Sequence, residues 1–118
     1  MSTRTLTVPI HGAVEVFLAP AIMAAPFLLG LGNVATAFAV VIGAVMLGSA
    51  LSLVGEGRTV PLSAHAGFDY AVAYVALAGA IAAAIAGDTA GTILLVGVGA
   101  AQALLAATTR FSLAPRSA

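Results

Sequence analysis

The stretch "GAVEVFLAPAIMAAPFLLGL", Gly12 to Leu31, decides the fold class. It has 20 residues, and its only charged residue is Glu15. A helix of about 20 mostly apolar residues is long enough to cross the hydrocarbon core of a bilayer. A secretory signal peptide is the competing interpretation, but the run is long for one and further apolar runs follow it directly. We therefore predict a retained transmembrane helix.

Three further apolar runs follow the first one. They cover Val34–Val54, a segment that starts after Ser63 and continues to Ala86, and Thr89–Thr109. The turns Gly30–Asn33 and Gly87–Gly91 connect the paired runs, since glycine adopts the positive φ of a tight turn without strain. Ser63 and Thr89 are the expected N-caps. The chain is thus predicted to be an all-α integral membrane protein with four transmembrane helices.

The composition agrees with a bilayer as the surrounding solvent. Of the 118 residues, 62% are hydrophobic and 7% are charged, and the net charge is zero. A soluble domain usually has about 25% charged residues. There is no basic patch for a nucleic-acid partner and no cysteine for a disulfide or a thiolate metal site. No Ser-His-Asp set falls in a predicted aqueous pocket and no glycine loop carries a lysine, so we expect no enzymatic activity.

The four arginines predict the orientation. Arg4 precedes the first run, Arg58 lies between the second and third runs, and Arg110 and Arg116 follow the fourth. All four therefore fall on one side of the membrane, which the positive-inside rule makes the cytoplasmic side. We predict a multi-pass protein of a bacterial-type inner membrane with both termini in the cytoplasm.

Residues 54 positions apart suggest a duplicated helical hairpin. The shift superposes both histidines, the two carboxylates within apolar runs and two glycines: His11 and His65, Glu15 and Asp69, and Gly43 and Gly97. Repeat 1 spans about residues 4–57 and repeat 2 about residues 58–111, within a single membrane domain of residues 1–118. Since each repeat crosses the membrane twice, the copies are expected to be parallel and related by a pseudo-twofold axis along the membrane normal. The second run is expected to superpose on the fourth without a gap.

The segment "AAPFLLGLG", Ala24 to Gly32, resembles the SPW-repeat family of bacterial membrane proteins. Repeats of that family pair two helices around a Ser-Pro-Trp motif, and Ala25-Pro26-Phe27 stands where that tripeptide would. The resemblance extends in outline over both hairpins. It implies a small integral membrane protein built from two hairpins, and it implies no defined activity.

Three residues within the runs are expected to shape the bundle interior. Pro20 and Pro26 in the first run each remove a backbone donor, which predicts a kink. Gln102 lies about mid-way along the fourth run. Its amide is expected to bond across a helix interface, which would stabilise the bundle by about 0.6–2 kcal/mol.

Each histidine precedes a carboxylate by four residues, so that both members of a pair lie on one helix face. The pairs are His11 with Glu15 and His65 with Asp69. A carboxylate deep within a span costs about 2.5–3.5 kcal/mol on insertion scales. Both carboxylates are therefore expected to face the bundle interior.

Three interpretations of these pairs are open. In the first, each pair satisfies itself and anchors a helix start, and the chain is a structural or accessory subunit of a larger membrane complex, or a homo-oligomer, without a cofactor. In the second, the first and third spans adjoin, and the two pairs bind a divalent ion such as zinc or iron, or the histidines bind haem. In the third, the pairs take up and release protons. We expect the first, with metal, haem or proton binding as the alternative.

Overall fold

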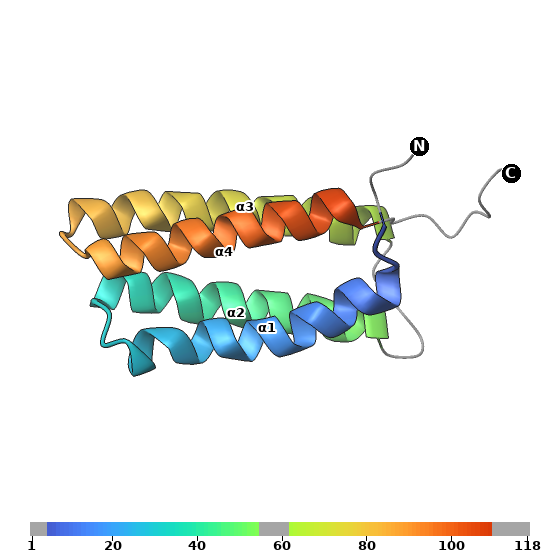
Figure 1. The fold of residues 1–118 in the computed structure, drawn as a ribbon, viewed down its shortest axis with the longest axis horizontal. Coiled ribbons are helices and arrows are strands. Elements are labelled where there is room, and N and C mark those ends of the chain that lie inside the picture. Colours follow the sequence, from blue (N-terminus) through green and yellow to red (C-terminus); the bar gives the residue numbers. More distant parts are fainter. Residues whose placement is uncertain (1–4, 55–61, 110–118) are drawn as a thin grey trace, which may run out of the picture.

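The computed structural model describes residues 5–54 and 62–109, and both segments are almost entirely helical. The helices are α1 (Val8–Leu28), α2 (Asn33–Val54), α3 (Leu62–Ile85) and α4 (Thr89–Thr108). All four are long and apolar enough to cross a membrane. They lie side by side in one bundle (Figure 1). The predicted all-α fold with four candidate transmembrane helices is confirmed.

The helices α1 and α3 both begin before their predicted starts. α1 begins at Val8 rather than Gly12, because Pro9 lies in its first turn. There the fixed φ of proline favours a helix, and its missing N–H would have had no helical partner. α3 begins at Leu62, so Ser63 lies inside the helix and is not its N-cap.

Each hairpin closes through a glycine in the left-handed region, as the sequence predicted. Gly30, between α1 and α2, has φ 63°, and Gly87, between α3 and α4, has φ 79°. Residues other than glycine rarely adopt such positive φ angles without strain. Both turns lie at the end of the bundle opposite to the starts of α1 and α3 (Figure 1).

The N-cap of α4 is Asp88 and not Thr89. The Asp88 carboxylate accepts a hydrogen bond from the backbone N–H of Gly91 at 2.9 Å, as an N-cap side chain does. Its other oxygen accepts from the backbone N–H of Gly32, just before α2, at 2.8 Å. One carboxylate therefore ties together the turns of both hairpins.

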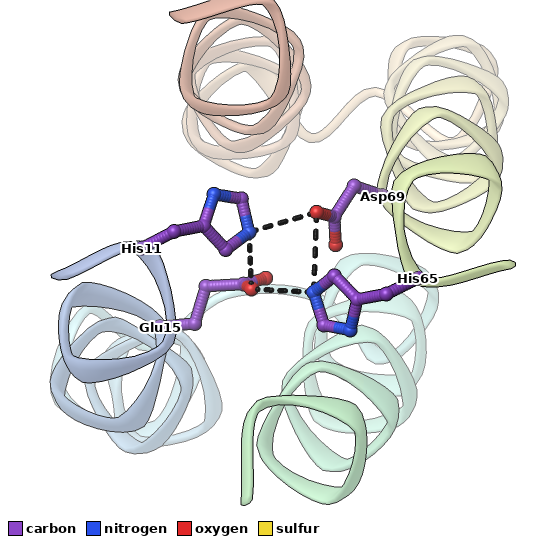
Figure 2. A group of neighbouring side chains, drawn as sticks. All are labelled: His11, Glu15, His65 and Asp69. Atoms are coloured by element: carbon purple, nitrogen blue, oxygen red, sulfur yellow. Dashed lines mark hydrogen bonds and ion pairs between the residues drawn. The ribbon is translucent and has the colours of Figure 1, made fainter. Parts of the chain in front are cut away.

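The two hairpins pack so that α1 and α3 face each other across the bundle. α1 packs along α2, α3 packs along α4, and α2 joins the hairpins through α3. α1 and α3 run in the same direction, and α2 and α4 run back (Figure 1). The view along the bundle in Figure 2 shows α1 and α3 on opposite sides of its centre. The second interpretation of the sequence required these two spans to adjoin, and this holds for their side chains, which reach across the bundle, and not for their backbones.

The bundle is apolar outside and carries its polar groups inside. Large apolar side chains point outward, with exposed fractions that reach 81% for Phe17 and 84% for Ile85. The buried polar residues are His11, Glu15, His65, Asp69, Gln102 and Thr109. The rest of the core is rich in alanine, which allows the helices to approach closely. This distribution suits a lipid surrounding.

Buried positions recur along the chain with two different shifts. Those of α1 recur in α3 54 positions later, as Ala19 and Ala73 illustrate. Those of α2 recur in α4 56 positions later: Ala35, Ala39, Ile42, Gly43, Met46, Ala50 and Leu53 correspond to Gly91, Leu95, Val98, Gly99, Gln102, Ala106 and Thr109. The expected superposition of the second run on the fourth without a gap is therefore wrong by two residues. α3 is three residues longer than α1, and the connection after it is one residue shorter.

Gly43 and Gly99, which are 56 positions apart, each lie close to the backbone of the neighbouring helix in their own hairpin. A Cβ atom on Gly43 of α2 would lie 2.8 Å from the carbonyl oxygen of Ala19, and one on Gly99 of α4 would lie 3.2 Å from the carbonyl oxygen of Ala73. A Cβ atom on Gly97 would meet no described atom within 4 Å. The close approach of Gly43 to α1 is therefore matched by that of Gly99 to α3 and not by Gly97, whose match at a shift of 54 has no counterpart in these contacts.

Both prolines lie within α1, and the helix continues through them. Their rings remove the hydrogen bonds that the carbonyls of Val16 and Ile22 would otherwise accept. In Figure 1 the first turns of α1 are inclined to the rest of the helix.

Candidate metal centre

Two histidines and two carboxylates meet inside the bundle near the end where α1 and α3 begin. His11 and Glu15 come from α1, His65 and Asp69 come from α3, and all four are at most 1% exposed. In each helix the histidine precedes the carboxylate by about one turn, so that both side chains project from the inner face. Figure 2 shows the two pairs pointing at one another across the bundle centre. We call these four residues the central cluster.

The central cluster forms a closed square in which imidazole nitrogens alternate with carboxylate oxygens. Nε2 of His11 lies 2.6 Å from Oε1 of Glu15 and 2.8 Å from Oδ2 of Asp69. Nε2 of His65 lies 3.1 Å from the same Glu15 oxygen and 3.3 Å from the same Asp69 oxygen. One ligand atom from each residue lies within 4.8 Å of all the others. Each histidine thus contacts a carboxylate of the opposite hairpin as well as that of its own helix.

The four short N···O contacts of the square cannot all be hydrogen bonds donated by the imidazoles, because the two nitrogen atoms carry too few hydrogens. Each Nε2 carries at most one hydrogen but faces two carboxylate oxygens, so at most two hydrogens are shared among four N···O contacts. A cation at the centre would instead accept a lone pair from all four atoms. Zinc and similar ions bind nitrogen and oxygen at about 2.0–2.2 Å, which places tetrahedral ligands roughly 3.3 Å apart and neighbouring square ligands roughly 2.9 Å apart. The spacing of the central cluster suits such an ion.

The charge of the central cluster also suits a divalent ion. Two ionised carboxylates carry two negative charges, and neutral imidazoles, the form that binds metals, add none. One divalent ion therefore gives a neutral site. Neutrality matters because an uncompensated charge buried in a membrane protein costs several kcal/mol. A monovalent or a trivalent ion would leave such a charge.

Gln102 connects both carboxylates from a third helix. Its Nε2 donates to Oε2 of Glu15 at 2.9 Å and to Oδ1 of Asp69 at 2.9 Å. Gln102 belongs to α4 and is fully buried. The sequence predicted one hydrogen bond across a helix interface, and Gln102 makes two, one to α1 and one to α3. Together they fix the carboxylate groups that complete the square.

His11 is oriented by a contact on the other side of its imidazole. Its Nδ1 lies 2.6 Å from the hydroxyl oxygen of Thr109, and that hydroxyl donates to the backbone carbonyl of Leu105 at 2.6 Å. Because the hydroxyl proton is directed at Leu105, the oxygen accepts the proton of Nδ1, which leaves Nε2 to face the square. Metal-binding histidines are commonly held in this way. A backbone hydrogen bond of 3.0 Å from Leu6 to Thr108 ties the start of α1 to this end of α4.

The central cluster consists of the four residues that the sequence singled out, but part of its surroundings was missed. The i, i+4 spacing predicted the contacts within α1 and within α3. Thr109 was not identified, although it follows Gln102 by seven residues, a spacing that returns to the same helix face. Pro20 and Pro26 lie farther along α1 and do not belong to the cluster.

No model of a known protein family, no curated protein and no solved structure matches the chain. The resemblance of Ala24–Gly32 to SPW repeats therefore stays an expectation. What the chain does has to be inferred from the geometry of the central cluster and of the helices that hold it.

Proposed function

We propose that this chain is an integral membrane protein that binds one divalent transition-metal ion between two helical hairpins. Each hairpin would contribute one imidazole nitrogen and one carboxylate oxygen. The observation that carries the proposal is that the Nε2 atom of each histidine faces carboxylate oxygens of both hairpins at 2.6–3.3 Å. Nitrogen and oxygen ligands of this kind suit zinc, iron and related ions.

Self-satisfied pairs, the first interpretation of the sequence, account for this geometry less well. Separate pairs would need only the contacts within α1 and within α3. The contact of 2.8 Å between His11 and Asp69 crosses the bundle and is shorter than the contact of 3.3 Å between His65 and Asp69 on one helix. A structural role in a larger membrane complex or a homo-oligomer stays a prediction, and it is compatible with a bound ion.

The geometry favours a bare ion over haem. The two imidazole centroids lie 5.4 Å apart, and the Nε2 atoms of both histidines contact the same two carboxylate oxygens. In a bis-histidine haem the macrocycle lies between the two axial nitrogens, and here carboxylates occupy that space. Two additional acidic ligands are also foreign to the axial ligand sets of haem proteins.

The geometry also favours an ion over a proton path. A path across the membrane needs polar steps from the central cluster to the far end of the bundle. Among the described residues, the core in that direction is apolar, and it includes Ala19, Ile22, Ala39, Ile42 and Leu95. Proton uptake would therefore be confined to the cluster itself.

We infer that the chain arose by duplication of a helical hairpin, with repeat 1 at about residues 4–57 and repeat 2 at about residues 58–111. The recurring burial along α1 and α3, and along α2 and α4, supports this inference. The equivalent contacts of Gly43 and Gly99 support it as well. A pseudo-twofold axis along the bundle would bring the two His-x3-carboxylate segments to the same depth, where one ion can bind both.

The orientation in the membrane is proposed from the sequence. The arginines that predict it, Arg4, Arg58, Arg110 and Arg116, lie outside the described residues. By the positive-inside rule, the end at which α1 and α3 begin would face the cytoplasm of a bacterial-type inner membrane. The central cluster would then lie a few ångströms inside the cytoplasmic leaflet, within reach of ions that enter from that side.

Metal analysis of the chain purified in detergent tests the proposal. The protein is loaded with Zn²⁺, freed of excess ions and assayed for metal and protein. We expect a stoichiometric ion in the wild type and none in the double variant His11→Ala/His65→Ala. The variant Asp88→Asn, which alters a carboxylate at the opposite end of the bundle, is the matched control and should retain the ion. A wild-type chain that retains no stoichiometric zinc after loading would contradict the proposal.

A further inference from the structure

The two carboxylates of the central cluster divide their oxygens between the square and Gln102. Oε1 of Glu15 and Oδ2 of Asp69 face the imidazoles. The remaining oxygens, Oε2 of Glu15 and Oδ1 of Asp69, each accept from the amide nitrogen of Gln102 at 2.9 Å. An amide NH2 group has two hydrogens, one for each carboxylate. The whole donor capacity of Gln102 is therefore directed at the two acidic residues.

The orientation of the Gln102 amide is set by these carboxylates. Its oxygen, Oε1, has no hydrogen-bond partner within residues 5–54 and 62–109, although the side chain is fully buried. A buried oxygen left in this state costs about 1–3 kcal/mol. The opposite orientation would place this oxygen against two carboxylate oxygens, and neither of them can donate a hydrogen bond when the carboxylates are ionised. The amide therefore has one stable orientation, with its NH2 group toward the acidic residues.

We infer that Gln102 determines which ions the central cluster accepts, by restricting each carboxylate to a single ligand oxygen. This inference rests on the proposed function. With Oε2 and Oδ1 bound to the amide, Glu15 and Asp69 each offer one oxygen, and the two histidines each offer one nitrogen. The result is a four-donor N2O2 site for a small ion with a tetrahedral preference, of which zinc is the main example.

The same restriction acts against larger or more oxygen-demanding ions. Ca²⁺ takes six to eight oxygen ligands and commonly binds carboxylates through both oxygens, whereas Mg²⁺ requires octahedral geometry. Mn²⁺ likewise prefers carboxylate, carbonyl and water ligands in octahedral sites. None of these ions is well served by two single oxygens and two imidazoles inside an apolar bundle. Gln102 is thus a positioning residue whose effect is on selectivity.

The other half of the bundle supplies a substitution for the test. Met46 on α2 stands 56 positions before Gln102, in the equivalent buried place, and it is 1% exposed. Methionine is close to glutamine in size but has no hydrogen to donate. The variant Gln102→Met would therefore free both carboxylates with little change of volume. The variant Ser49→Ala is the control for loss of a polar group, because within residues 5–54 and 62–109 this hydroxyl bonds only to the backbone carbonyl of Met46.

The experiment compares Zn²⁺ and Mn²⁺ affinities in detergent by competition with a chromophoric chelator, and it records the visible spectrum of Co²⁺-loaded protein. We expect wild type and Ser49→Ala to show the intense absorption of four-coordinate Co²⁺. In Gln102→Met we expect the ratio of Zn²⁺ to Mn²⁺ affinity to fall by about tenfold or more, in line with other outer-sphere partners of metal ligands. The Co²⁺ spectrum of this variant should change to the weak absorption of a six-coordinate ion.

The outcomes separate the inference from the proposed function. A wild-type chain that binds no metal overturns both. A wild-type chain that binds Co²⁺ with a six-coordinate spectrum overturns the inference alone, whether or not the variant folds. An unchanged affinity ratio and spectrum in a folded Gln102→Met variant also overturn the inference alone and leave the metal site standing.

Discussion

Nε2 of His11 lies 2.8 Å from Oδ2 of Asp69, whereas Nε2 of His65, one turn before Asp69 on the same helix, lies 3.3 Å from that atom. The closer partner of this carboxylate is thus a histidine of the other hairpin. Neither hairpin contains the central cluster by itself. Whatever binds there should therefore hold the two halves of the bundle together.

Single histidine substitutions should weaken metal binding to a similar extent in both hairpins. His11→Ala and His65→Ala each remove one of four ligands from the proposed site. We expect each to lower Zn²⁺ affinity by more than about 100-fold, beyond the 10–100-fold typical of residues that only support a ligand. Competition titration in detergent measures the change. If either variant bound Zn²⁺ as tightly as the wild type, that histidine would not be a ligand.

Thr109 and Thr108 offer a matched test of the support for His11. Thr109→Val removes the oxygen that holds the Nδ1 proton of His11, and we expect about 10–100-fold lower Zn²⁺ affinity. Among the described residues, the hydroxyl that Thr108→Val removes bonds only to the backbone of its own helix, and the variant should change affinity by less than about threefold, within the scatter expected of a surface change. Equal effects of the two substitutions would show that the contact with His11 does not matter for binding.

The metal-free bundle should depend on the charges of the central cluster. Asp69→Ala leaves the buried groups around it without a partner, and loss of one member of a buried ionic network costs about 3–5 kcal/mol. We expect a decrease of that size in the free energy of unfolding, measured by reversible denaturant titration in mixed micelles with a chelator present. Ser49→Ala serves as the control and should cost less than about 1 kcal/mol, the value of a typical exposed or local hydrogen bond. A loss below that value for Asp69→Ala would contradict the buried network.

Much of the fold was predictable from local sequence. Apolar runs such as Gly12–Leu31 indicated the four helices, because bilayer thickness fixes their length and composition. The spacing of His11 and Glu15, repeated in the second hairpin, indicated a pair within each helix, and a cluster shared by both helices was only the alternative interpretation. These features depend on residue types that are rare in this chain, and chance matches among them are few.

The finer relations were not predictable in the same way. Gly43 and Gly97 matched at a shift of 54, but it is Gly99, and not Gly97, that shares with Gly43 a close approach to the backbone of the neighbouring helix. The shift changes from 54 between α1 and α3 to 56 between α2 and α4 because α3 is longer than α1. The length of a helix cannot be predicted to within two residues from an alanine-rich sequence. The spacing of seven from Gln102 places Thr109 on the same helix face, but its position beside His11 also depends on how α4 packs against α1, which that spacing does not specify.

Substitutions at Gly43, Gly97 and Gly99 test the shift of 56 between α2 and α4. Gly43→Ala would place a methyl group against a backbone carbonyl, and we expect it to destabilise the bundle by about 1–3 kcal/mol, whereas Gly99→Ala, with its nearest atoms at 3.2 Å, should cost less than Gly43→Ala. Gly97→Ala meets no described atom, and since alanine favours helices it should be neutral or stabilising by up to about 1 kcal/mol. The same titration in micelles measures all three. The reverse order of effects would contradict the shift of 56.

X-ray absorption spectroscopy of the zinc-loaded wild-type protein tests the central claim most directly. The account predicts about four nitrogen and oxygen neighbours at roughly 2.0–2.1 Å, with the outer-shell scattering of two imidazoles. His11→Ala and His65→Ala should each remove one imidazole from that signal. A zinc ion without histidine ligands, or a protein that holds no zinc after loading, would contradict it.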